Sequence, residues 1–215
     1  MRLKQFGTRR KVEKDIMNEE QLWLELNAIA HERDAPLPES WKTNYWTLYQ
    51  LVRQLRPRTI CEIGVRAGYS AYVMLRANPT ASVLGIEANF DEAVQATSGG
   101  KKDFYKHALS TLADYDFDVI LADSHSLARI PAVDLVYVDG DHSREGCFRD
   151  LDLAFKSNDR VLVHDVTHIR AVQQACDDYV AAHPQLAATL IESPPFGYML
   201  IERKPIRTCT RRQRL

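Results

Sequence analysis

Residues 59–70 read Thr59-Ile60-Cys61-Glu62-Ile63-Gly64-Val65-Arg66-Ala67-Gly68-Tyr69-Ser70. A short apolar run ends at Ile63, a G-x-x-x-G pattern follows, and a helical pattern opens at Tyr69. This order predicts a buried strand, a tight loop and a helix N-terminus. Glycines let such a loop approach a ligand closely, and the free N–H groups of the helix can bind a carboxylate or phosphate. We therefore expect a ligand site at the carboxyl edge of an α/β sheet.

Short apolar runs and helical patterns alternate along the chain after this point. Alternation of this kind predicts parallel strands with helices on both faces of the sheet. The expected buried strands are 59–63, 82–86, 117–122, 133–138 and 160–163, and the expected helices are 69–77, 90–95, 144–156 and 169–182. Two further strands, 187–191 and 198–203, flank a Pro-rich turn and are expected to be antiparallel. The fold class is a Rossmann-like, doubly wound seven-stranded α/β sheet, mostly parallel with a C-terminal antiparallel hairpin.

Two helices are expected before the first strand, one over 18–32 with Asn18 as its N-cap and one from a Ser40 cap to Leu55. The resulting organisation has four parts: a basic N-terminal extension (1–17), a helical cap (18–56), the Rossmann-like domain (57–204) and a basic C-terminal tail (205–215). The second helix carries four aromatic residues, which we interpret as packing, with a wall of an acceptor pocket as the alternative. These are Trp41, Tyr45, Trp46 and Tyr49.

Composition excludes several classes of protein. The 215 residues are 45% hydrophobic and 27% charged, which is ordinary for a globular domain. No run approaches the ~20 apolar residues of a membrane span, and no signal-peptide pattern opens the chain, so we expect a cytoplasmic protein without a membrane partner. The four cysteines lack C-x-x-C spacing and are expected to be reduced, with Cys61 and Cys176 in the core.

Lys and Arg gather at the two ends, with six in residues 1–14 and six in residues 203–215. Basic tails can contact nucleic acid. These tails contain no recognisable nucleic-acid-binding module, so solvated ends are the favoured interpretation and nucleic acid is disfavoured as a partner.

Polar side chains follow the second and third expected strands. Glu87 ends the second strand, where a carboxylate can accept hydrogen bonds from both hydroxyls of a ribose. Asp123 and Ser124 follow the third strand, where they could bind the amino group and ring edge of adenine. Together with the glycine loop, Glu87 indicates a nucleoside-containing cofactor. A dinucleotide is disfavoured because the loop lacks G-x-G-x-x-G.

Acidic and histidine residues follow the fourth and fifth strands. Asp139 and His142 come after one, and His164 with Asp165 after the other. If these strands are neighbours, Asp139 and Asp165 can converge on one divalent ion. Oxygen ligands suit Mg²⁺, whereas a nitrogen from His164 would favour Mn²⁺ or Fe²⁺. His142 is a candidate general base for removing a hydroxyl proton.

These motifs together resemble the class I S-adenosylmethionine-dependent methyltransferases, and within them the small-molecule O-methyltransferases that include macrocin-type and cephalosporin-hydroxylase-like proteins. The resemblance covers residues 45–202 and is carried by 61–70, 138–143 and His164-Asp165. It implies S-adenosylmethionine as cofactor and O-methylation of a small hydroxylated metabolite. It implies that Glu62, Gly64 and Gly68, with Ser70, lie at the methionine part, Glu87 at the ribose, and Asp123 with Ser124 at the adenine. It also implies Asp139, beside the cofactor, and Asp165 as metal ligands and His142 as the base, while His164 is a further ligand candidate because of its nitrogen.

The chain departs from the family pattern twice. Residues 156–160 replace a usual Pro-Gly-Gly turn, which Asn158 can form, and His164 stands where an acidic residue is common. Two alternatives stay open from the sequence. One is a non-methylating protein of the same fold, either a hydroxylase-like enzyme or a binding module whose tails contact nucleic acid, and the other is an NAD-type oxidoreductase. The acceptor and the oligomeric state, a homo-oligomer included, are not set by the sequence.

Overall fold

The computed structural model describes residues 17–31, 36–88 and 104–205. Its strands are β1 (Thr59–Ile63), β2 (Ser82–Glu87), β3 (Asp116–Leu121), β4 (Leu135–Val138), β5 (Arg160–His164), β6 (Leu186–Ile191) and β7 (Tyr198–Arg203). They form one seven-stranded sheet in the order β3-β2-β1-β4-β5-β7-β6. The first five are parallel, and β7 is antiparallel to both of its neighbours. The expected fold class is confirmed.

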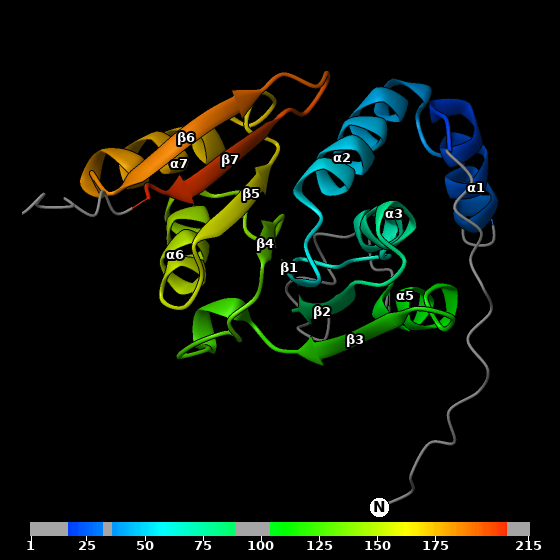
Figure 1. The fold of residues 1–215 in the computed structure, drawn as a ribbon, viewed down its shortest axis with the longest axis horizontal. Coiled ribbons are helices and arrows are strands. Elements are labelled where there is room, and N and C mark those ends of the chain that lie inside the picture. The colour runs from blue at the N-terminus through cyan, green and yellow to red at the C-terminus, as the bar shows by residue number, and fades with distance from the viewer. Residues whose placement is uncertain (1–16, 32–35, 89–103, 206–215) are drawn as a thin grey trace, which may run out of the picture.

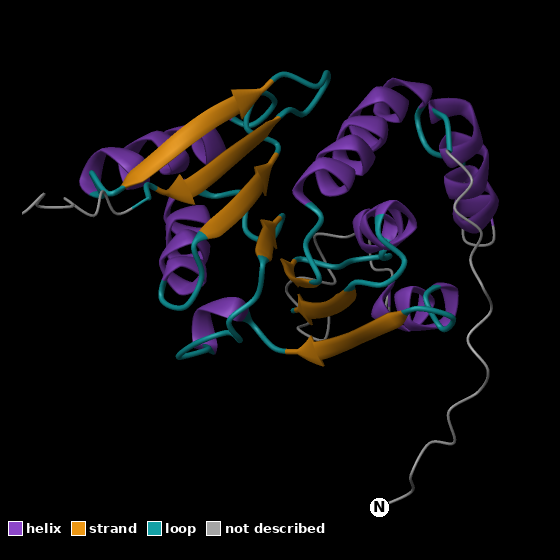
Figure 2. Cartoon of the chain, in the orientation of Figure 1, coloured by secondary structure: helices purple, strands orange, loops and turns teal. Residues whose placement is uncertain are grey.

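Helices cover both faces of this sheet (Figures 1 and 2). Those described are α1 (Glu19–His31), α2 (Lys42–Leu55), α3 (Tyr69–Ala77), α5 (Phe104–Thr111), α6 (Arg144–Phe155) and α7 (Arg170–Ala182), with short 3₁₀ turns η1 (Glu39–Trp41) and η2 (Ser124–Ser126). α6 and α7 lie together on one face, and α1, α2 and α3 on the other. The helix expected at 90–95 lies outside the described residues.

Side chains of the central strands alternate between two hydrophobic cores. On β4, Val136 and Val138 pack with α6 and α7, whereas Leu135 and Tyr137 pack with α1, α2 and α3. The side chains of β5 alternate between the two cores in the same way. Successive side chains of a strand point to opposite faces, so one apolar run supplies both cores. This is why these strands read as continuous hydrophobic runs in the sequence.

The edge strand β3 differs from its expected burial. Phe117–Ala122 was expected to be a buried strand, but β3 is largely exposed, with Ile120 at 44% and Leu121 at 41%. The reason is position, because β3 pairs only with β2 among the described strands. A hydrophobic run does not distinguish a central strand from an edge strand. The expected start of β4 at Val133 is also wrong by two residues.

Two N-terminal caps were expected, and one is confirmed. The Asn18 side chain accepts a hydrogen bond from the Gln21 N–H at 2.9 Å, and the Gln21 side chain accepts one from the Asn18 N–H at 3.1 Å. This reciprocal pair is a capping box. Ser40 does not cap α2, because it lies inside η1 and α2 begins two residues later without a side-chain cap.

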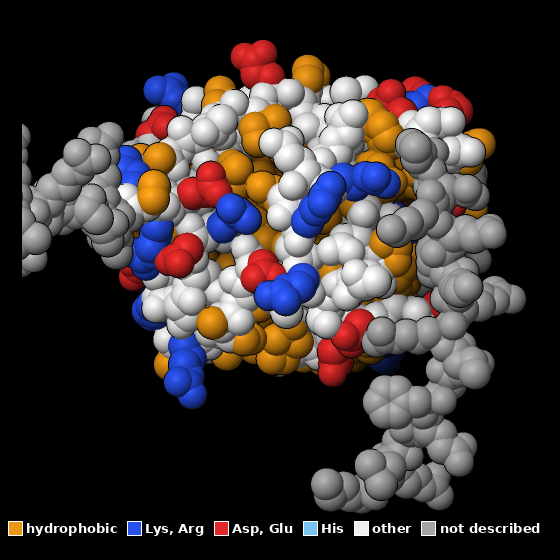
Figure 3. Space-filling view, in the orientation of Figure 1, with side chains coloured by type: hydrophobic (Ala, Val, Ile, Leu, Met, Phe, Trp, Pro, Cys, Tyr) orange, Lys and Arg blue, Asp and Glu red, His pale blue; other side chains and the backbone are white. Residues whose placement is uncertain are grey.

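The three described cysteines, Cys61, Cys147 and Cys176, are buried free thiols, which confirms Cys61 and Cys176 as core residues. None of the described helices is long and apolar enough to cross a bilayer. The two basic ends lie almost wholly outside the described residues. On the face seen in Figure 3, Lys and Arg side chains are interspersed with Asp and Glu.

Candidate active site

The carboxyl ends of four parallel strands meet at one edge of the sheet. Ile63 of β1 is in register with Ile86 of β2 and with Val138 of β4, and Val138 is in register with Val163 of β5. The pairing continues past the strand ends, since the Gly64 N–H donates to the Ile86 carbonyl and the Asp139 N–H to the Ile63 carbonyl, both at 2.9 Å. The residues that follow these strands are therefore neighbours.

The glycine loop has the backbone that only glycine adopts easily. Gly64 and Gly68 have φ values of +89° and +81°, and Gly68 is the N-cap of α3. A Cβ atom on Gly64 would lie 2.2 Å from the carbonyl oxygen of Asp139. One on Gly68 would lie 2.7 Å from the Cβ of Ala108. Both glycines are thus required by the backbone and by close neighbours.

Glu87 is tied to this loop. Its Oε2 accepts a hydrogen bond from the Arg66 N–H at 2.5 Å, and Arg66 has a φ of +48°, a conformation that non-glycine residues seldom adopt. Glu87 is 6% exposed. The carboxylate therefore helps to fix the loop as well as lying beside it.

Glu62 is buried under the loop with no exposed surface. The Ser70 hydroxyl donates a hydrogen bond to its Oε1, while Oε2 has no hydrogen-bond partner within the described part of the chain. Burial raises the pKa of Glu62 well above its usual value, with the Ser70 hydrogen bond opposing the rise. A buried carboxylate with an unpartnered oxygen can receive a donor from a ligand.

Asp123 and Ser124 follow β3 but their side chains turn to different partners. The Asp123 Oδ1 accepts from the His125 N–H at 2.9 Å and caps η2. The Ser124 hydroxyl donates at 2.6 Å to the Oδ1 of Asp150, a fully buried residue of α6. The expected pair is therefore adjacent in sequence but not joined in the structure. Asp150 had no signal in the sequence, because it lies in an ordinary amphipathic helix.

The acidic and histidine residues converge. One ligand atom from each of Asp139, His164 and Asp165 lies within 4.8 Å of the others. The His142 Nε2 is 3.2 Å from the Asp139 Oδ1 and 3.2 Å from the Asp165 Oδ2. The His164 Nδ1 is 3.2 Å from the Asp139 Oδ1. The adjacency of β4 and β5, which the sequence argument required, produces this cluster.

The charges of the cluster shift its pKa values in opposite directions. Burial alone would raise the pKa of Asp139, but the charges and hydrogen bonds of His164 and His142 hold it well below its usual range. The hydrogen bond to Asp139 raises the pKa of His142. Burial opposes charging of His164, yet Asp139 and Asp165 raise its pKa overall. Burial raises the pKa of Asp165.

Asp165 itself is held in an unusual conformation. Its φ is +63°, its side chain is 11% exposed, and its Oδ1 is buried without a hydrogen-bond partner in the described residues. A left-handed non-glycine residue costs free energy and persists where the surroundings fix it, often at functional sites. The backbone after β5 thus directs a partly unsatisfied carboxylate toward the cluster.

Aromatic residues of the helical cap and of the turn before β7 lie on the side of the cluster that faces the cap. Tyr45 packs against the core on this face of the sheet, and its burial, together with the charge of Asp139, raises its pKa. Phe196, in the turn before β7, makes ring contacts with His164 at 5.3 Å and with Trp41 at 5.5 Å. Trp46 and Tyr49 instead stack on each other at 5.0 Å and serve packing. Of the four aromatic residues, Trp41 thus adjoins a ring that contacts the cluster, whereas Trp46 and Tyr49 pack on each other.

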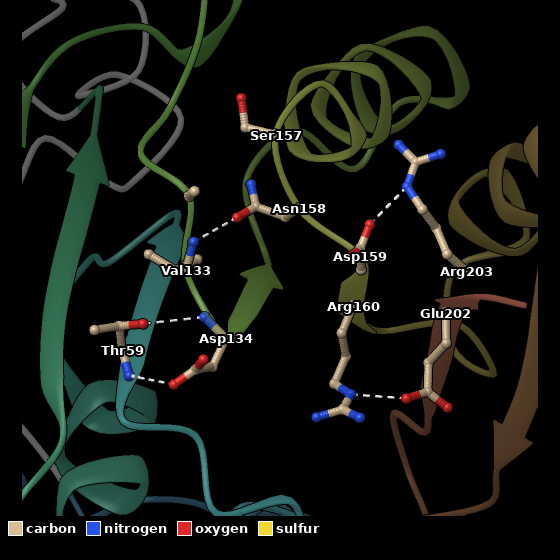
Figure 4. Close-up of a pocket in the computed structure, with 10 residues that line it drawn as sticks. Thr59, Val133, Asp134, Ser157, Asn158, Asp159, Arg160, Glu202 and Arg203 are labelled. Atoms are coloured by element: carbon tan, nitrogen blue, oxygen red, sulfur yellow. Dashed lines mark hydrogen bonds and ion pairs between the residues drawn. The ribbon is translucent and has the colours of Figure 1, made fainter. Parts of the chain in front are cut away.

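A cavity also lies away from these residues. It has a volume of about 490 Å³ and lies at the opposite edge of the sheet, where β1, β4 and β5 begin (Figure 4). Its charged residues pair with each other, Arg160 with Glu202 at 2.7 Å and Arg203 with Asp159 at 2.8 Å. Asn158 donates to the Ala154 carbonyl and accepts from the Val133 N–H there, so it forms the turn through its side chain. None of the candidate site residues lines this cavity.

Comparisons with known proteins agree with this arrangement. A family model described as a methyltransferase domain matches residues 61–166. No curated protein matches the sequence. Among solved structures, an O-methyltransferase candidate from Klebsiella pneumoniae is 20% identical, with a TM-score of 0.64 over 86% of this chain and 90% of that one.

Two further structures carry the cofactor or its product. The O-methyltransferase TomG from Streptomyces achromogenes, solved with SAM, is 20% identical, with a TM-score of 0.59 over 88% of this chain and 92% of that one. An O-methyltransferase from Bacillus cereus, solved with SAH, is 19% identical, with a TM-score of 0.58 over 86% and 90%. Residues 61–166 of this chain thus match a methyltransferase domain, and the chain shares the fold of these O-methyltransferase structures.

Proposed function

We propose that this chain transfers the methyl group of S-adenosylmethionine to a hydroxyl oxygen of a small acceptor. The observation that carries the proposal is the contact between the glycine loop and the acidic cluster, where the Cβ position of Gly64 is 2.2 Å from the Asp139 carbonyl oxygen. A donor held by the loop would face an acceptor held by the cluster. The O-methyltransferase descriptions of the structural neighbours support the same reaction class.

The cofactor would lie across the ends of β1, β2 and β3. The loop that contains Gly64 and Gly68 would hold its methionine part, and the unpartnered Oε2 of Glu62, held in place by Ser70, would accept from the amino group. Glu87 would accept from the ribose hydroxyls, and Asp123, with Ser124 beside it, would meet the adenine. Asp139 borders the cofactor and the acceptor at once.

His142 is the proposed general base. Its Nε2 lies 3.2 Å from an oxygen of Asp139 and of Asp165, so that nitrogen carries a hydrogen and Nδ1 is the atom that would take the proton. As the acceptor oxygen forms its bond to the methyl carbon, the carbon–sulfur bond breaks and its electron pair stays on sulfur, giving S-adenosylhomocysteine. The acceptor proton passes to His142.

The cluster also fits a divalent metal ion. Three ligand atoms lie within 4.8 Å of one another, and the buried Asp165 Oδ1 has no hydrogen-bond partner among the described residues. Asp139, His164 and Asp165 would hold the ion, and their mixed oxygen and nitrogen set suits Mg²⁺ or Mn²⁺. When bound, such an ion lowers the pKa of an acceptor hydroxyl and orients it.

Calorimetry with S-adenosylmethionine tests the proposal. We expect the wild-type chain to bind and Glu87→Ala to bind at least roughly tenfold more weakly, because hydrogen bonds to a charged group contribute about 1.5–3 kcal/mol each. Glu87→Gln keeps an acceptor for the Arg66 N–H and should fall between the two. Asp114→Ala, an exposed carboxylate in the turn before β3, is the matched control and should bind normally.

Methyl transfer is then measured as S-adenosylhomocysteine release with a panel of small hydroxylated compounds. We expect release with at least one acceptor and loss of release in His142→Gln with cofactor affinity retained. Failure of both S-adenosylmethionine and S-adenosylhomocysteine to bind the folded wild-type chain would refute the proposed function.

A further inference from the structure

Asn44 is a buried polar residue that links the helical cap to the acidic cluster. It lies on α2 and is 2% exposed, and its neighbours Ser193 and Tyr198 are 1% and 0% exposed. Its Oδ1 is 3.0 Å from the His164 Nε2 and accepts from the Tyr198 hydroxyl at 2.7 Å. A buried amide in such a network is costly unless each of its atoms has a partner.

The orientation of the Asn44 amide follows from one neighbour that can only accept. The Ser193 carbonyl lies 3.3 Å from the Asn44 Nδ2, and a carbonyl cannot donate a hydrogen bond. The nitrogen must therefore face Ser193. The Ser193 hydroxyl donates to Thr47 at 2.8 Å, so it does not compete for the opposite orientation. The Asn44 oxygen consequently faces His164.

This orientation fixes the hydrogen on His164. Because the Asn44 Oδ1 is an acceptor, the His164 Nε2 must carry a hydrogen. The other ring nitrogen, Nδ1, therefore faces the cluster, where it lies 3.2 Å from the Asp139 Oδ1 and 3.7 Å from the Asp165 Oδ1. Rings of Tyr198 and Phe196, at centroid distances of 5.1 Å and 5.3 Å, confine the imidazole from the sides.

We propose that Asn44 is a positioning residue that accepts a hydrogen bond from the His164 Nε2–H and so directs Nδ1 at the cluster, where it can bind a metal ion. The hydrogen-bond network of Asn44 exists without a metal ion. Only its expected effect on metal affinity rests on the proposed metal site. A second residue that fixes the orientation of a metal-binding histidine usually changes metal affinity about 10- to 100-fold when it is removed. The helical cap would thus contribute to a site whose ligands all lie in the sheet domain.

Nitrogen-15 NMR of the metal-free protein tests the tautomer directly, with the His164 signals assigned by their loss in His164→Gln. We expect the His164 Nε2 to carry a hydrogen at neutral pH in the wild type and in Asn44→Asp, which keeps the acceptor, and to lose it in Asn44→Leu, where only the Asp139 carboxylate at Nδ1 still accepts a hydrogen bond from the ring. Thr47→Val is the matched control, since Thr47 lies one turn away on α2 and contacts Ser193 but not His164. It should leave the tautomer unchanged.

Manganese titration followed by electron paramagnetic resonance gives the second measurement. We expect Asn44→Leu to bind Mn²⁺ about 10- to 100-fold more weakly than the wild type and Thr47→Val to bind equally. If the wild type shows the Nε2–H form but binds no Mn²⁺, the proposed metal site fails and the positioning of His164 stands. If the His164 Nε2 of the wild type carries no hydrogen, or Asn44→Leu keeps that hydrogen, the inference is overturned. The wild-type spectrum decides the matter even where Asn44→Leu does not fold.

Discussion

Gly64 packs so closely against the backbone of Asp139 that a Cβ atom at position 64 would lie 2.2 Å from the Asp139 carbonyl oxygen. The turn after β1 and the turn after β4 are therefore in backbone contact. This contact joins the loop proposed to bind the donor with the residue proposed to face the acceptor. A side chain at position 64 must separate them.

Gly64→Ala is accordingly expected to destabilise the protein by about 1–3 kcal/mol, because it adds overpacking to a left-handed backbone. Urea unfolding measures the loss, and cofactor affinity should fall with it. Gly140→Ala is the graded comparison, since its Cβ would meet its nearest atom at 3.0 Å and its φ is not positive. Equal stability of Gly64→Ala and the wild type would contradict the close contact.

Arg56→Gly should have the opposite effect. Arg56 ends α2 in the left-handed conformation with a φ of +50°, a position where helices usually have glycine. Relief of that conformation, less the entropy of the added glycine, should stabilise the protein by up to about 1 kcal/mol. Gln54→Gly, in the last turn of the same helix, should instead destabilise it by about 0.5–1 kcal/mol. The two variants should therefore shift the midpoint of thermal unfolding in opposite directions.

Glu62 should make stability depend on pH. Burial raises its folded-state pKa, so the folded protein holds this proton more tightly than the unfolded chain does. Its stabilising contribution is complete below the usual value of about 4.3 and is lost as pH rises through the folded pKa. Glu62→Gln should therefore gain stability relative to the wild type as pH rises above the usual glutamate pKa. A difference between the two proteins that stays constant with pH would exclude this role of the buried carboxyl.

Asp165→Asn tests the proposed metal site at its most strained residue. Asparagine tolerates the left-handed backbone and has nearly the same shape, so the fold should survive. Mn²⁺ at 100 times its dissociation constant should stabilise the wild type by about 2.7 kcal/mol, and the variant should lose most of that gain. Differential scanning fluorimetry with and without EDTA measures it. Asp114→Asn should respond to Mn²⁺ as the wild type does.

The sequence predicted the parts of the site that follow strand ends. Glu87 and Asp139 come directly after a hydrophobic run and Asp165 one residue later, and parallel strands bring their carboxyl ends to one edge. That rule placed them without any knowledge of side-chain contacts. The bounds of the β1–α3 loop and of β7 were predicted to the residue because glycine and proline mark their ends.

Contacts that depend on tertiary packing could not be predicted. Asn44 lies 120 positions from His164, and nothing in the pattern of α2 distinguishes it from a solvent-facing residue. Ser124 was expected to face a ligand, but its hydroxyl donates to Asp150 of α6. The packing position of this helix could not be predicted from the sequence. The burial of β3 was overestimated because hydrophobic periodicity reports how a strand is composed and not how many neighbours it has.

The place of β7 in the sheet has a consequence for synthesis of the chain. β7 lies between β5 and β6, so β5 keeps an open edge until residues 198–203 have left the ribosome. The donor half of the protein, from β1 to β4, can be assembled earlier, whereas His164 gains Tyr198 only at the end. Translation would complete the cofactor loop first and the surroundings of the acceptor last. A nascent chain halted before Tyr198 would present an unpaired strand to chaperones or to other chains.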